Sequence, residues 1–150
     1  MIPDFINVKN APWPLLPPGI WDATLDEVHA RFANNPKRLI LFEGMKIGIE
    51  NIFKAGSPQL FLDGSYVTGK PLPNDYEICW DATSVDPNLL DPTLMIFDDG
   101  RKDQKLRFKG EYFPAFWVEA GSGHPFIDFF QQDKESGKKK GIVRIGNYLL

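Results

Sequence analysis

Glycine, serine and acidic residues gather in one stretch, Leu60 to Asp81, which reads LFLDGSYVTGKPLPNDYEICWD. Gly64 lets a phosphate approach the backbone closely, and the amide and hydroxyl of Ser65 can donate to phosphate oxygens. Because residues i and i+2 of a strand point to the same side, Asp75 and Glu77 would present two carboxylates together. Paired carboxylates suit Mg²⁺. The stretch therefore predicts a site for a phosphate group and a divalent cation.

The same stretch contains the spacing of a P-loop, because Gly64 to Lys70 reads G-x-x-x-x-G-K. A P-loop also needs Ser or Thr after its lysine to hold Mg²⁺, and then a helix that faces the phosphates. Here Pro71 follows the lysine, and Pro73 prevents a long helix from continuing. We therefore reject a P-loop and assign the phosphate chemistry to the Gly64-Ser65 turn.

The segment DGSYVTGKPLPNDYE resembles the signature of the polymerase-β-like nucleotidyltransferase superfamily, in which a Gly-Ser turn is followed by Asp-x-Asp or a close variant. The resemblance implies a nucleoside triphosphate site. It places Gly64 and Ser65 in the phosphate-binding turn and makes Asp75 and Glu77 two catalytic, metal-binding carboxylates. Glu77 is a departure from the pattern, because its side chain is one methylene longer than that of Asp.

A third carboxylate comes from a later strand in that superfamily. We choose Asp128 in FIDFF as the third metal-binding and catalytic residue, because apolar residues flank it as they would flank a ligand on a strand. Asp98 and Asp99 are the alternatives. Two Mg²⁺ ions held in this way would fix the triphosphate and lower the pKa of an attacking hydroxyl. Mn²⁺ is the alternative metal.

Basic residues are needed to neutralise the phosphates during such a transfer, since catalysis there is mostly positioning and charge stabilisation. Lys70 is the cation nearest to the Gly-Ser turn in the sequence. Lys105, with Arg107 beside it, is a second candidate for contact with the nucleotide or the leaving pyrophosphate.

Most of the chain also resembles a bacterial family of nucleotidyltransferase-like proteins, through phrases such as RFANNPKR, GEYFPA, FIDFFQQD and KGIV. Minimal members of the superfamily include antitoxins that adenylylate a partner toxin and toxins that modify transfer RNA. The resemblance implies transfer of a nucleotide from ATP or another NTP to a protein partner, in a toxin-antitoxin or defence system. The alternatives are a catalytically inactive antitoxin or interaction module, and transfer onto RNA.

Composition limits the partners and the setting of the protein. The net charge of -3 and the pI near 5.4 lack the basic footprint of a DNA-binding domain, so no DNA partner is expected. A lone cysteine, Cys79, excludes an internal disulfide. No stretch approaches the ~20 apolar residues that span a bilayer. We expect a cytoplasmic protein with no membrane association.

The remaining patterns predict the elements that position these residues. Residues 1–20 contain five prolines and should form an extended arm, ahead of a single domain at 21–150. Thr24 and Glu27 have capping-box spacing, and Asn35-Pro36 begins a long apolar stripe, so both predict helices.

Strands are predicted at 59–63, 76–81, 93–99, 125–132 and 141–149, and a short helix or a loop at 101–110. Together these patterns predict an α+β fold. We expect a nucleotidyltransferase-like mixed sheet with helices packed mainly on one face.

Overall fold

A five-stranded mixed sheet forms the centre of the protein, as a computed structural model of residues 1–150 shows. Its strand order is β1-β5-β2-β3-β4. Strands β1 and β5 run parallel, as do β3 and β4, whereas β2 is antiparallel to both of its neighbours, β5 and β3. The bounds are β1 Ile20–Asp22, β2 Gln59–Asp63, β3 Tyr76–Trp80, β4 Gly110–Pro114 and β5 Ile142–Gly146. The predicted α+β class and mixed sheet are confirmed.

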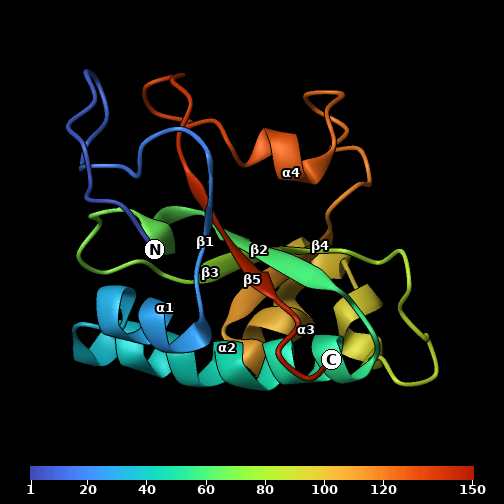
Figure 1. Ribbon diagram of the computed structural model, residues 1–150. Coiled ribbons are helices and arrows are strands. Elements are labelled where there is room, and N and C mark those ends of the chain that lie inside the picture. The colour runs from blue at the N-terminus through green and yellow to red at the C-terminus, as the bar shows by residue number, and fades with distance from the viewer.

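Three helices cover one face of the sheet, and one short helix lies on the other (Figure 1). The first three are α1 (Leu25–Phe32), α2 (Pro36–Lys54) and α3 (Asp98–Phe108), and the fourth is α4 (Phe126–Phe129). Two 3₁₀ turns, η1 (Ser65–Val67) and η2 (Pro92–Met95), complete the elements. The expected packing of helices mainly on one face is thus present. None of the helices is long and apolar enough to cross a membrane.

The sequence signals at the helix starts act as predicted. The Thr24 side chain accepts a hydrogen bond from the Glu27 amide at 3.1 Å, and the Glu27 carboxylate accepts one from the Thr24 amide at 3.0 Å. The Asn35 side chain accepts from the Arg38 amide at 2.9 Å, and Pro36 occupies the first turn of α2. These caps satisfy amide groups that have no partner inside the helix.

Two predicted strands are wrong. Residues 93–99 form η2 and the start of α3, and residues 125–132 contain α4 rather than a strand. Short apolar runs do not distinguish a strand from a buried helical turn by periodicity. In α4 the rings of Phe126 and Phe130, four residues apart, both pack on Phe113 of β4 at 4.8 and 4.9 Å between ring centroids. Of the two alternatives given for residues 101–110, a short helix or a loop, the helix is correct, because α3 covers most of this segment.

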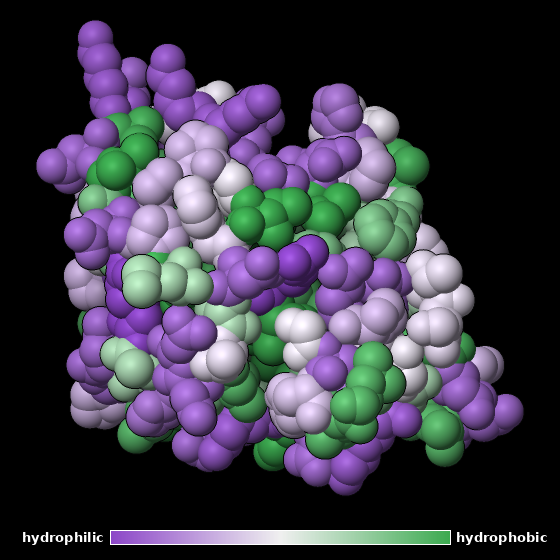
Figure 2. All heavy atoms as spheres, viewed as in Figure 1, coloured by the Kyte–Doolittle hydropathy of each residue, from purple (hydrophilic) through white to green (hydrophobic).

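The two faces of the sheet differ in the number of buried apolar residues that pack on them. On the helix-covered face, β-strand residues such as Leu60, Ile78 and Tyr112 join a core cluster of 23 buried residues. On the α4 face, Phe61, Cys79 and Phe113 belong to a cluster of only 6. Apolar side chains on the face of the molecule seen in Figure 2 form small patches separated by hydrophilic residues. The α4 side of the sheet therefore has room for polar groups.

The proline-rich arm packs against the domain through both of its halves, and Ile2 in the first half belongs to the buried core cluster. Leu15 and Leu16 are buried, and Ile6 pairs with Leu15 in an isolated antiparallel bridge. The Gly69 amide donates to Pro14 O at 2.8 Å. The arm is thus joined to the loop that follows the Gly-Ser turn.

Helix α2 approaches the sheet closely because it carries glycine at the contact. A Cβ built on Gly48 would lie 2.0 Å from Tyr112 Oη, and the Tyr112 hydroxyl is hydrogen-bonded to Tyr76 Oη at 2.5 Å.

We predict that Gly48→Ala destabilises the protein by about 1 to 3 kcal/mol through overpacking. Chemical denaturation measures the loss. Gly146→Ala is the control, since nothing lies within 4 Å of its Cβ position; equal effects of both changes would contradict the prediction.

Candidate functional site

Three carboxylates from neighbouring strands meet on the α4 face of the sheet. Glu77 of β3 is in register with Glu111 of β4, and Asp75 precedes β3 by one residue. One carboxylate oxygen from each of these residues lies within 4.8 Å of the other two. An octahedral Mg²⁺ shell has opposite ligands about 4 Å apart. The oxygen-only donor set of this carboxylate triad, Asp75, Glu77 and Glu111, therefore suits a hard divalent cation.

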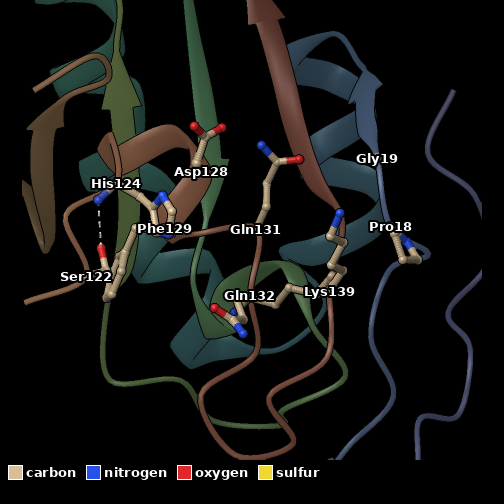
Figure 3. A pocket seen from close by; sticks show the side chains of 10 residues that line it. Pro18, Gly19, Ser122, His124, Asp128, Phe129, Gln131, Gln132 and Lys139 are labelled. Atoms are coloured by element: carbon tan, nitrogen blue, oxygen red, sulfur yellow. Dashed lines mark hydrogen bonds between the residues drawn. The ribbon is translucent and has the colours of Figure 1, made fainter. Parts of the chain in front are cut away.

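The structure brings Glu111 to Asp75 and Glu77, whereas it places Asp128 elsewhere. Asp128 lies on α4, is exposed, and lines a separate cavity of about 640 Å³. Figure 3 shows Gln131 between Asp128 and the Pro18-Gly19 segment across this polar cavity. Our choice of Asp128 depended on the strand assigned to 125–132, and that strand is a helix. The alternatives, Asp98 and Asp99, begin α3 and do not join the triad either.

Crowding of like charges and burial shift the triad toward its protonated forms. Burial raises the pKa of Glu77 to about 7, and the neighbouring Glu111 and Asp75 add to the rise. Burial also raises the pKa values of Asp75 and Glu111. Lys105 of α3 lies 4.0 Å from Asp75 Oδ2 and 3.9 Å from Glu111 Oε1. Lys105, predicted to contact the nucleotide, is thus the counter-charge closest to these two acids.

A fourth acid, Asp63, continues the row onto β2. It is in register with Glu77, is fully buried, and its Oδ1 has no hydrogen-bond partner. Cys79 Sγ donates to its Oδ2 at 3.3 Å. Burial, with the charge of Glu77 as a second cause, raises the pKa of Asp63 well above its ordinary value. Burial thus favours the protonated form of Asp63 beside the triad, and nothing in the sequence analysis singled this residue out.

The predicted phosphate-binding turn lies directly against Glu77. Gly64 has φ 77°, which favours glycine, and a Cβ there would lie 3.0 Å from Glu77 Cδ. Gly64 and Ser65 line a cavity of about 180 Å³, the lysine cleft, together with Lys70, Glu77, Lys134 and Lys140. Glu77 therefore belongs to both the triad and the lysine cleft. Lys70, predicted to contact the nucleotide, lines this cleft, and its ammonium lies 5.0 Å from the centre of the Trp13 ring.

The Gly64–Lys70 loop is held in place by Arg38, a buried residue of α2. Its guanidinium donates to the carbonyl oxygens of Tyr66 (2.7 Å), Thr68 (2.9 Å) and Lys70 (2.6 Å), and also to that of Phe32 (3.2 Å). A planar guanidinium can satisfy several acceptors at once, which an ammonium on a flexible stem does less well. Arg38 therefore fixes the loop that carries the Gly-Ser turn.

A third cavity adjoins the triad from the β4 side. This aromatic cavity has a volume of about 500 Å³, and its lining includes Glu77, Glu111, Arg101, Phe97 and Trp117. The Arg101 guanidinium carbon lies 3.9 Å from the centre of the Phe113 ring, and Nε donates to Tyr112 O at 3.2 Å. Glu77 is thus reached from both the lysine cleft and the aromatic cavity, and Glu111 from the aromatic cavity.

These features define an α+β protein with an acidic site on one face of a mixed sheet, beside a lysine-lined cleft. The model of DUF6932, described as a family of unknown function, matches residues 8–146, and the chain belongs to that family. Neither the curated proteins nor the solved structures contain a match to the chain.

We predict that Arg38→Met lowers the free energy of unfolding by about 3 kcal/mol, because four buried carbonyl contacts lose their donor. Denaturant titration measures the change. Lys37→Met, one residue earlier on the exposed side of α2, is the control and should stay within about 0.5 kcal/mol. A stability loss shared by both variants would show that Arg38 has no special role.

The raised pKa of Glu77 predicts how the stability of the protein depends on pH. Since folding raises the pKa of Glu77 from 4.5 to about 7, its contribution is greatest below pH 4.5 and is lost as pH rises through 7. Without divalent cations, the parent should lose up to about 3 kcal/mol of this contribution across that window.

Glu77→Gln should lose less stability over that pH window than the parent, and Mg²⁺ or Mn²⁺ should raise the melting temperature of the parent more at pH 8 than at pH 5. Glu43→Gln, an exposed change on α2, is the control. Melting curves at several pH values measure both effects. If the melting temperature of Glu77→Gln depends on pH as that of the parent does, Glu77 is not the source of the pH dependence.

Proposed function

We propose that this protein is a polymerase-β-like nucleotidyltransferase that transfers a nucleotide, AMP from ATP in the first instance, to a protein partner. The observation that carries the proposal is the position of Glu77, which belongs to the carboxylate triad and also lines the lysine cleft beside Gly64 and Ser65. Such a transfer requires carboxylates that can hold a metal next to cations that can face a polyphosphate. The cleft supplies three lysines, and three acids, Glu77, Asp133 and Glu135, also line it.

In this reaction the acceptor hydroxyl attacks the α-phosphorus, a new P–O bond forms, and pyrophosphate leaves with the electrons of the broken P–O bond. Lys70, Lys134 and Lys140 line the cleft where the polyphosphate chain would lie and would balance its negative charge. The triad would hold Mg²⁺, or Mn²⁺ in its place, which when bound supplies Lewis-acid stabilisation of the phosphate oxygens.

The acceptor would enter from the opposite side, through the aromatic cavity. Glu77 and Glu111 line that cavity, so a hydroxyl placed there would meet carboxylates that can accept its proton. Trp117 and Val118, which line that cavity, and the preceding Phe116 are 49%, 61% and 53% exposed. Exposed aromatic residues beside a site favour a macromolecular acceptor, and the net charge of -3 favours protein over RNA.

One observation favours the alternative of a catalytically inactive antitoxin or interaction module. Lys105 already lies near both Asp75 and Glu111, where it partly neutralises the charge that would attract a metal. In that case the protein would keep the fold and bind its toxin or other partner without chemistry.

Transfer of label from α-³²P-ATP to protein tests the proposal. We expect Mg²⁺-dependent labelling of a protein in an extract of the source cells, sensitive to protease but not to ribonuclease. Glu111→Gln and Asp75→Asn should reduce it about 100-fold or more, because they remove metal ligands. Asp103→Asn, an exposed change on α3, is the control and should leave labelling unchanged.

Label on RNA would favour the RNA acceptor. If the purified protein gives no label on either polymer while still binding a partner protein, the inactive interaction module is correct.

A further inference from the structure

Lys140 is a buried lysine without a partner. It lies two residues before β5, and only 9% of its surface is exposed. Its backbone amide donates to Gln131 O at 2.9 Å, but its ammonium forms no ion pair and no hydrogen bond within the protein. The ammonium itself is not sealed from solvent, so an anion that enters either cavity lined by Lys140 can reach it and form a charge-assisted hydrogen bond.

The side chain lies where two cavities meet. Lys140 lines the lysine cleft together with Gly64, Ser65 and Glu77, and it also lines the polar cavity of about 640 Å³. Phe129 and Gln132 are shared by the same two cavities. A ligand that starts at the Gly-Ser turn can therefore extend past Lys140 into the polar cavity.

The lining of the polar cavity differs from that of the lysine cleft. Of its ten lining residues one, Phe129, is hydrophobic. Gln131 lines the polar cavity but not the lysine cleft, and Figure 3 shows its amide end between Asp128 and the Pro18-Gly19 segment. An aromatic ring and several amide groups are suitable contacts for a polar ring system such as a nucleoside.

The acids beside Lys140 do not satisfy it as ion-pair partners. Neither Asp63 nor the three acids that line the lysine cleft, Glu77, Asp133 and Glu135, forms an ion pair with its ammonium. An anion in the cleft would complete the pairing of Lys140.

We propose that Lys140 is the principal anion contact for a polyphosphate chain that runs from the Gly64-Ser65 turn past its ammonium, with the attached nucleoside in the polar cavity beside Gln131. This assignment rests on the proposed function for the class of ligand. It adds Lys140, which lies outside the Gly-Ser and acidic motif, to the residues that would bind the nucleotide. It also states that the ligand runs from the Gly64-Ser65 turn toward the polar cavity.

Calorimetric titration with inorganic tripolyphosphate and with ATP, each with Mg²⁺ and with EDTA, tests the assignment. Lys140→Gln should weaken binding of both ligands about 10- to 100-fold, the range for a hydrogen bond to a charged group. Lys140→Arg should retain most of the affinity. Lys138→Gln, an exposed lysine two residues earlier, is the matched control and should bind like the parent.

Gln131→Ala separates the two halves of the ligand, since it should weaken binding of ATP but not of tripolyphosphate. The assignment is overturned if Lys140→Gln binds tripolyphosphate as the parent does, or if the folded parent does not bind it. Equal effects of Gln131→Ala on both ligands would overturn the placement of the nucleoside. Circular dichroism of each variant shows whether it is folded.

Failure of this assignment can be told apart from failure of the proposed function. Tripolyphosphate binding that depends on Lys140, without any transfer of label, would disprove the transferase and leave the anion contact in place. Transfer of label that is unaffected by Lys140→Gln would support the transferase and disprove the anion contact.

Discussion

The structure depends on one electrostatic constraint, the crowding of four carboxyl groups on one face of three adjacent strands. Asp63, Glu77 and Glu111 are in register across β2, β3 and β4, with Asp75 next to them. Like charges at such separations cannot all be ionised in a partly buried setting without compensation. The charges of Lys105 and Lys140 reduce this repulsion, and burial favours the protonated form of Asp63. Because such crowding costs free energy in the folded protein, the carboxyl groups of the α4 face do not account for the stability of the fold.

Stability comes from the opposite face. The 23-residue core lies between the sheet and helices α1, α2 and α3, where Gly48 allows a helix to touch Tyr112. The α4 face has a small apolar cluster, so the acids there sit beside a modest core and not inside the main one. Arg38 connects the two regions, because it belongs to α2 and its guanidinium holds the loop of the Gly-Ser turn. Proteins commonly combine a well-packed support with a strained or charged site in this manner.

Local signals in the sequence were sufficient for much of this arrangement. The caps at Thr24 and Asn35, the alternation in β3 and the Gly-Ser turn each depend on neighbours within a few residues, and the structure has them as predicted. Glu111, Arg38 and Lys140 depend on contacts between distant segments. Glu111 follows from the parallel pairing of β3 with β4, a long-range register that periodicity does not give. The alternation in GEYFP indicates a strand with Glu111 and Phe113 on one side. Placing Glu111 beside Glu77 also requires the order of the strands in the sheet, which this pattern does not give.

The two lysines nearest to the acids are arranged for different kinds of partner. Lys105 is about half exposed, and its distances of 4.0 and 3.9 Å to Asp75 and Glu111 are at the outer limit of an ion pair. Such a contact contributes little free energy and is released at small cost, so a divalent cation can replace it. Lys140 is buried for most of its surface, and it lines both the lysine cleft and the polar cavity without forming an ion pair. Under the proposed function, the triad side of Glu77 would take an exchangeable cation and the cleft side would take an anion, and a metal-bound polyphosphate would satisfy both.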